Sequence, residues 1–317
     1  MRTPLLASLA TMMLVAAPAF AESNLQIGGQ LFLQYGWQTT PNGRLKAGSR
    51  GYHSFDLTRS YLTADSKLAD GLTARLTSDL VRGTGGDTNM VIRFAYTQAE
   101  LPFGQVRFGL IPTLWTAYEN YFWGYRVQGE PFSTREKWFS LSDLGTSFSG
   151  KQGALSYDLG YFNGEGRLVE SDERKQYQAK LTYRLGKNWE ATAFYNGLPA
   201  THPGRRTLMG LFGYKDPTFT LAAQHAWTRD ANFKPGLASS IFATSALGTP
   251  QVEGIARWMY VKPNLSNGVD EKNVWITGVA YKPVKGYTIL LDDEMVTYAD
   301  TRRGLENVLA LHTSYTF

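Results

Sequence analysis

Charged side chains recur at alternate positions of segments whose other positions are apolar. In Tyr177–Leu185 (YQAKLTYRL), Lys180 and Arg184 alternate with an apolar stripe, so a strand here would turn both charges to one face. If the apolar stripes contact lipid, the opposite face lines water, and its charges set an ion preference through their field. The residues predicted to line this aqueous face are Arg59, Arg75, Arg93, Arg107, Lys180, Arg184, Arg257, Lys282, Asp79, Asp158, Glu190 and Glu253.

The balance of this set is eight basic against four acidic residues. An excess of positive charge in a narrow aqueous path favours anions, so the set predicts a mild anion preference. The alternative is a lattice of mutually paired charges that only satisfies buried groups. Apolar and polar residues alternate poorly around Arg59, so the sequence does not decide whether this side chain faces the water or the lipid.

Other kinds of chemistry find little support in the sequence. The chain has no cysteine, which excludes thiolate nucleophiles and disulfides. The histidines are His53, His202, His225 and His312, and their spacing matches no metal-site pattern. His312 has Ser314 two residues on, without a motif for an activated nucleophile. We therefore predict no enzyme activity, no catalytic residue, no cofactor and no metal.

The elements that must position the charges are short alternating strands. Leu155–Tyr161, Leu25–Trp37 and the closing segment Leu309–Phe317 each carry one apolar face. Tyr and Trp gather at strand ends, as at Tyr35 and Trp227, which is typical of the aromatic girdles of a membrane barrel. A soluble β-sandwich would show the same alternation without a reason for the girdles.

Connection lengths favour the barrel. Short turns such as Gly186-Lys187-Asn188 alternate with longer polar links such as 163–175, as in outer-membrane barrels. Fifteen strand segments are clear, and a weaker one at Ala238–Leu247 makes an even sixteen; fourteen is the alternative. The predicted fold class is all-β, a transmembrane antiparallel β-barrel that ends on the aromatic Phe317.

The N-terminus predicts export. Arg2, an apolar run and Ala19-Phe20-Ala21 form a signal peptide over residues 1–21, followed by the barrel domain over 22–317. A membrane anchor is the alternative, but Pro18 breaks the short run. The net charge of +5 says little about partners, and no nucleic acid is expected. The predicted location is the outer membrane of a Gram-negative bacterium.

Four stretches carry a family resemblance: Phe55–Leu80, Val91–Leu110, Asp143–Gly166 and Ile276–Tyr298. They resemble the phosphate-selective-porin-like (porin O/P type) outer-membrane porins. The resemblance implies sixteen strands, a homotrimer and an inward-folded constriction loop. The candidate loop is 115–142, with Arg126, Glu130, Arg135 and Lys137. It has no lysine cluster, so phosphate selectivity is not carried over.

The predicted function is a porin for passive diffusion of small hydrophilic solutes, with a mild anion preference. Its expected contacts are those solutes or anions, outer-membrane lipid and two further copies of the chain. One alternative is a barrel sheath that houses a partner protein such as a cytochrome. A second alternative is a soluble secreted β-sandwich that binds a ligand.

Overall fold

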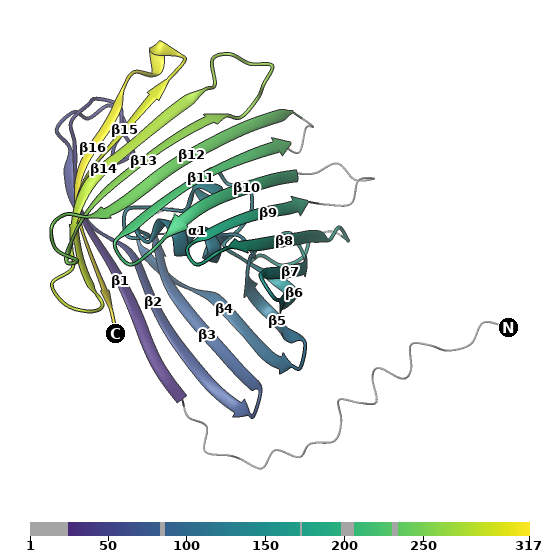
Figure 1. Ribbon diagram of the computed structural model, residues 1–317. Helices are drawn as coiled ribbons and strands as arrows, with labels where there is room; N and C mark the ends of the chain where they lie inside the picture. The colour runs from purple at the N-terminus through teal and green to yellow at the C-terminus, as the bar shows by residue number, and fades with distance from the viewer. Residues whose placement is uncertain (1–24, 83–85, 172, 198–205, 230–233) are drawn as a thin grey trace.

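The chain forms a closed barrel of sixteen antiparallel strands in the computed structural model, which describes residues 25–82, 86–171, 173–197, 206–229 and 234–317. Each strand is hydrogen-bonded to its neighbours in the sequence, and β1 pairs with β16 to close the sheet (Figure 1). The prediction of sixteen strands is confirmed. The β-sandwich alternative is wrong, because closure removes every sheet edge and leaves a single wall with an inside and an outside.

The first eight strands are β1 (Leu25–Gln38), β2 (His53–Ala69), β3 (Leu72–Arg82), β4 (Thr88–Leu101), β5 (Gly104–Pro112), β6 (Ser142–Gln152), β7 (Leu155–Phe162) and β8 (Gln176–Leu185). The second eight are β9 (Trp189–Gly197), β10 (Arg206–Lys215), β11 (Phe219–Arg229), β12 (Pro235–Ala246), β13 (Val252–Lys262), β14 (Lys272–Tyr281), β15 (Tyr287–Tyr298) and β16 (Glu306–Thr316). The weak segment predicted at Ala238–Leu247 is β12, so its existence is confirmed.

The two faces of the wall differ as the alternation predicts. Along β11, Leu221 and Trp227 are exposed on the outside, whereas Thr220, Ala222 and Gln224 are buried on the inside. Because the exposed positions of most strands are apolar, the solvent of the outer face is the hydrocarbon of a membrane. No helix within the described ranges is long and apolar enough to cross a membrane.

Connections alternate in length along the described strands. Adjacent strands are joined at one end of the barrel by turns such as Asp70–Gly71 and Pro102–Phe103, and at the other by longer segments such as 39–52 and 163–175. Short turns face the periplasm in outer-membrane barrels, so the longer segments mark the extracellular end. The predicted signal peptide, residues 1–21, lies outside the described residues.

The last residue helps to close the barrel. The backbone N–H of Phe317 donates to the carbonyl of Gly29 at 3.1 Å, and the N–H of Gly29 donates back at 3.0 Å. The Phe317 ring lies over Gly29, where a Cβ would come within 2.3 Å of the ring. Gly29 is therefore needed for the close approach of the terminal ring, which stacks on Tyr315 on the outer face.

Candidate functional site

The long segment between β5 and β6 folds into the barrel. It contains two short helices, α1 (Thr116–Trp123) and α2 (Phe132–Arg135), and α1 lies inside the ring of strands (Figure 1). Its backbone is tied to the wall: the N–H of Leu114 donates to Gln178 at 2.9 Å, and Lys215 donates to the carbonyl of Tyr121 at 2.6 Å. We call residues 113–141 the constriction loop.

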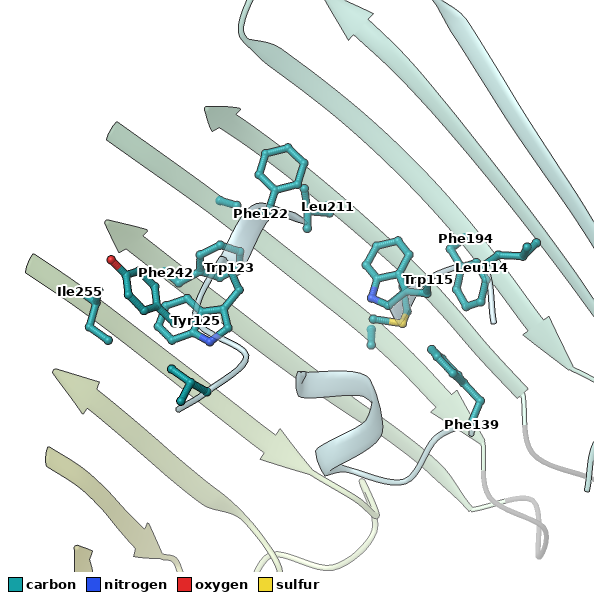
Figure 2. Close-up of a cluster of buried hydrophobic side chains, with 14 of the residues drawn as sticks. Leu114, Trp115, Phe122, Trp123, Tyr125, Phe139, Phe194, Leu211, Phe242 and Ile255 are labelled. Carbon is teal, nitrogen blue, oxygen red and sulfur yellow. The ribbon is translucent and has the colours of Figure 1, made fainter. Parts of the chain in front are cut away.

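An aromatic cluster fixes one side of the constriction loop. Trp115 packs on Phe194 of β9 with ring centroids 5.3 Å apart, and Trp123 packs on Phe242 of β12 at 5.4 Å (Figure 2). Both tryptophans are buried. Large rings of this kind bury much apolar area, so the loop is held firmly against the wall from β9 to β13.

A buried carboxylate is the polar anchor of the same contact. Glu119 accepts from the Arg257 guanidinium at 2.8 Å, from the Phe132 N–H at 2.6 Å and from Ser133 at 3.1 Å. Arg257 in turn lies 5.1 Å from the centre of the Trp123 ring. Because both charges are fully paired inside the protein, this pair fixes the loop and leaves no charge for a passing solute.

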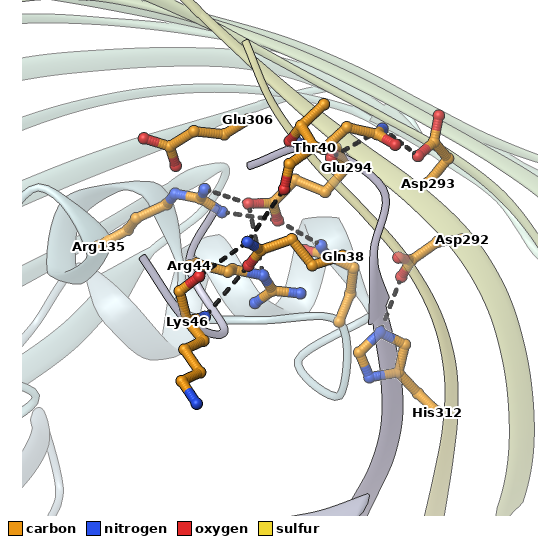
Figure 3. Close-up of polar contacts among 12 residues, drawn as sticks. Gln38, Thr40, Arg44, Lys46, Arg135, Asp292, Asp293, Glu294, Glu306 and His312 are labelled. Carbon is orange, nitrogen blue, oxygen red and sulfur yellow. Dashed lines mark hydrogen bonds and ion pairs between the residues drawn. The ribbon is translucent and has the colours of Figure 1, made fainter. Parts of the chain in front are cut away.

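A second anchor joins two extracellular segments. Glu294 of β15 accepts from Arg135 at 2.6 Å and from Gln128 at 2.9 Å, both on the constriction loop. Arg44, on the segment between β1 and β2, lies 3.8 Å from the same carboxylate (Figure 3). The segment 39–52 and the constriction loop are thus held together over the strands β13 to β16.

The opposite side of the lumen contains a cluster in which three arginines share two carboxylates. Asp79 of β3 accepts from Arg59 of β2 at 3.0 Å and from Arg93 of β4. Glu130 of the constriction loop pairs with Arg59 and, at 2.9 Å, with Arg126. We call these five residues the eyelet. Burial opposes the charge of Glu130, but Arg126 and Arg59 outweigh it and hold the pKa of Glu130 below its ordinary value.

The eyelet lies between two cavities. One, of about 840 Å³, opens between the end of the constriction loop and the segment 163–175. The other, of about 650 Å³, reaches the periplasmic ends of β1 to β3. Arg93 and Leu141 line both cavities. The two cavities therefore approach each other at the eyelet, along the wall from β2 to β5.

Two β-bulges place the eyelet arginines. The register of β1 and β2 passes from Leu33–Leu57 to Phe32–Arg59, which leaves Thr58 as the extra residue. The register of β3 and β4 passes from Ser78–Ile92 to Thr77–Phe94, which leaves Arg93 extra. A bulge re-aims neighbouring side chains, and here it turns Arg59 and Arg93 toward Asp79. The poor alternation around Arg59 has this cause.

The remaining predicted lumen residues all point to the inside, and most have one partner of opposite charge. Lys180 lies 3.2 Å from Asp158, Arg184 lies 3.5 Å from Glu190, and Lys282 lies 2.6 Å from Glu253. Arg75 pairs with Asp65 at 2.6 Å, whereas Arg107 donates to two glutamines. Arg257 faces inward but is covered by the constriction loop, so it is not on the passage.

The four predicted loop residues separate into two groups. Arg126 and Glu130 belong to the eyelet, whereas Arg135 is committed to Glu294. Lys137 is exposed at the rim of the extracellular cavity. Within 115–142, for which the family resemblance implied an inward fold, Trp115 and Trp123 contact the wall residues Phe194 and Phe242.

Sequence reasoning missed several charged residues at the site. Asp65, Glu294, Arg44 and Arg167 were not among the predicted lumen residues, although each lies at the lumen or its mouth. The signal for Glu294 was present: in β15 the buried positions alternate through Leu290, Asp292 and Glu294. The adjacent acid Asp293 blurred that alternation, because it lies on the outside. The loop arginines carry no periodic signal.

The histidines form no reactive site among the described residues. His312 lies 3.1 Å from Asp292, both fully buried, and no described hydroxyl hydrogen-bonds to its ring (Figure 3). His225 contacts Ser239 at 2.7 Å on the outer face. His202 lies outside the described residues. No group of three His, Asp or Glu side chains in the described ranges could hold a metal ion.

Comparison with known proteins gives a family and a fold. Residues 7–303 match the family model described as "Gram-negative porin". The outer-membrane channel DcaP of Acinetobacter baumannii is similar in structure, with a TM-score of 0.69 at 12% identity over 96% of this chain and 100% of that one. An anion-selective porin from Comamonas acidovorans gives 0.64 at 14% identity over 93% and 100%.

The trimer form of OmpT from Vibrio cholerae gives a TM-score of 0.66 at 12% identity, over 93% of this chain and 99% of that one. No curated protein sequence matches the chain.

Proposed function

We propose that this protein, which belongs to the Gram-negative porin family, favours anions. It is an outer-membrane channel through which small solutes diffuse. The observation that carries the proposal is the charge balance around the eyelet. Arg59, Arg93 and Arg126 share only the carboxylates of Asp79 and Glu130. Arg167, from the segment after β7, adds a further positive charge at the same place.

The eyelet and Arg167 together hold two more positive than negative charges. An anion that passes the eyelet therefore meets an attractive field, and a cation meets repulsion. The paired-lattice alternative describes the other wall, where Lys180, Arg184 and Lys282 each face one carboxylate. Both interpretations thus apply, each to its own half of the lumen.

We propose further that the protein is not an enzyme. A hydrolytic site needs a nucleophile, a base and an orienting group in contact. Asp292 and His312 supply two of these, but Nδ1 of His312 has no hydrogen-bond partner among the described residues. The pair is also fully buried, so no substrate reaches it. The sheath alternative is disfavoured by the constriction loop, which fills the lumen that a partner protein would need.

The assembly and processing of the chain also remain proposals. A homotrimer is supported by the structural similarity to the OmpT trimer form. Cleavage after residue 21 is supported by the sequence pattern at Ala19-Phe20-Ala21. Membership of the phosphate-selective (porin O/P) type stays a prediction. Because Lys137 is the one lysine in the constriction loop, we do not propose phosphate selectivity.

Planar-bilayer recording of the purified protein under a KCl gradient tests the channel and its preference together. We expect discrete current steps and a reversal potential displaced toward that of chloride. A reversal potential toward that of potassium would overturn the anion preference. The absence of steps from folded, heat-modifiable protein would overturn the open passage.

A further inference from the structure

The extracellular cavity has two chemically different walls. Its volume is about 840 Å³, enough for a small organic molecule with some water. One wall carries guanidinium and ammonium groups, and the other carries aromatic and aliphatic side chains. We call this cavity the vestibule, since any solute from outside crosses it before Arg93 and the eyelet.

The cationic wall contains Arg167, a guanidinium without a direct carboxylate contact among the described residues. Within the described ranges, no carboxylate forms an ion pair or hydrogen bond with Arg167. Arg93 and Arg167 line the same cavity, and burial together with the nearby charge of Arg93 lowers the pKa of Arg167. Lys137 stands at the rim, and the acids that face the vestibule are Glu130 and Glu165.

The acids of the vestibule already have partners. Glu130 is held by Arg59 and Arg126, and Glu165 accepts from Ser171 at 2.8 Å. Because Glu130 is engaged on its eyelet side, an anion in the vestibule meets Arg167, while the buried Arg93, which is bound to Asp79, adds positive charge at the same cavity. A guanidinium binds a carboxylate through two parallel hydrogen bonds, which suits it to this task better than a lysine.

The apolar wall is formed by Trp138, Phe139, Leu141 and Leu168. Trp138 is fixed by Phe132, with ring centroids 4.9 Å apart. Leu168 is 70% exposed, which leaves its aliphatic side chain in contact with water. A flat apolar body placed between Trp138 and Leu168 would remove this surface from water.

We propose that the vestibule binds organic monoanions that combine a carboxylate with a flat apolar body, as aryl carboxylates do. The carboxylate meets Arg167 and Arg93, and the ring lies along Trp138. The inference rests on the proposed anion channel, whose substrate class it names. Binding at the mouth concentrates such solutes before the eyelet, and it must stay weak enough for release.

Block of the chloride current by added carboxylates tests the site in the intact channel. Benzoate and acetate carry the same charge, and benzyl alcohol supplies the ring without charge. We expect benzoate to block in a saturable way, with a half-maximal concentration at least about fivefold below that of acetate, as one aromatic contact allows. Benzyl alcohol should have little effect.

Variants assign the effect to the two walls. Trp138→Ala should bring benzoate to the level of acetate, whereas Trp138→Phe should keep most of the difference. Arg167→Gln should raise the half-maximal concentration for benzoate at least about threefold, in keeping with the loss of one charged hydrogen bond. Arg302→Gln is the control: Arg302 pairs with Asp300 on the segment between β15 and β16, and neither residue lines the vestibule. This variant should leave benzoate block unchanged.

Equal block by benzoate and acetate in the unaltered channel would overturn the site without any variant. If the reversal potential in KCl still favours chloride, the proposed function survives that result. A reversal potential toward potassium would instead overturn the proposed function and the site together. Benzoate block that persists undiminished in Trp138→Ala, shown to be folded by its heat-modifiable migration, would also overturn the site.

Discussion

The wall from β9 to β15 and the wall from β2 to β5 both carry charged side chains into the lumen, but their local charge balance differs. At the first wall, Arg257 pairs with Glu119 of the constriction loop and Glu294 pairs with Arg135 of the loop, so these charges anchor the loop. On the second, Arg59, Arg93 and Arg126 outnumber their carboxylate partners. Where each arginine has its own carboxylate, the charges fix the loop. Where arginines are in excess, the remaining positive charge can attract anions.

The largest expected effect comes from breaking the anchor of the covered wall. Glu119→Ala leaves Arg257 buried without its partner, which should destabilise the packed loop by about 3–5 kcal/mol. The loop would then leave its place, so we expect larger and noisier single-channel currents. Bilayer recording and thermal unfolding in detergent measure the two consequences.

The matched control for the anchor is Glu190→Ala. Glu190 pairs with Arg184 at the periplasmic end, where the arginine is half exposed, so its loss should change the conductance little. Currents of unchanged size and noise in Glu119→Ala would contradict the assignment of Glu119 as the anchor.

The next effect compares one positive charge on each wall. Arg126→Gln at the eyelet should lower the anion-to-cation permeability ratio about two- to fivefold, since a charge this close in a watery path contributes about 0.5–1 kcal/mol. Lys180→Gln, paired with Asp158 beside the constriction loop, should change the ratio less. Reversal potentials in a KCl gradient give both ratios, and an equal fall in the two variants would remove the distinction between the walls.

Ionic strength sharpens the same comparison without a substitution. Screening shortens from about 10 Å at 0.1 M salt to about 3 Å at 1 M. The preference for anions should therefore weaken steadily as KCl rises at a constant gradient ratio. A ratio independent of salt would indicate that selectivity comes from size rather than from the eyelet charges.

The smallest effect concerns pH. The pKa of Glu130 lies below its ordinary value, so this carboxylate stays ionised as the pH falls from about 7 to about 5. The permeability ratio should stay constant over that range. At lower pH, protonation of Glu130 removes a negative charge and its ion pairs, so the anion preference should rise. Reversal potentials across the series check the sign, and a fall in anion preference on acidification would contradict it.

The barrel was predictable because its signals are local. Alternation in Tyr177–Leu185 and the order of short and long connections are properties of neighbouring residues, and they led to sixteen strands. The inward facing of Lys180, Arg184 and Lys282 followed from the same alternation.

The division of the lumen was not predictable in this way. It depends on where the constriction loop packs, and contacts such as Arg135 with Glu294 join residues far apart in the chain. Bulges at Thr58 and Arg93 shift the side-chain parity by one residue, which no alternation count detects. Counting charges along the sequence therefore predicts a mild anion preference but does not locate the residues from which it would arise.

Thiol accessibility tests most directly that solutes pass along the β2–β5 wall. The chain has no cysteine, so a single introduced thiol is unique. Thr63→Cys places it on the periplasmic cavity, and Ile255→Cys places it under the constriction loop on β13. An anionic methanethiosulfonate reagent should rapidly reduce the current through Thr63→Cys and leave Ile255→Cys unchanged. Rapid modification of Ile255→Cys with an unreactive Thr63→Cys would contradict the account.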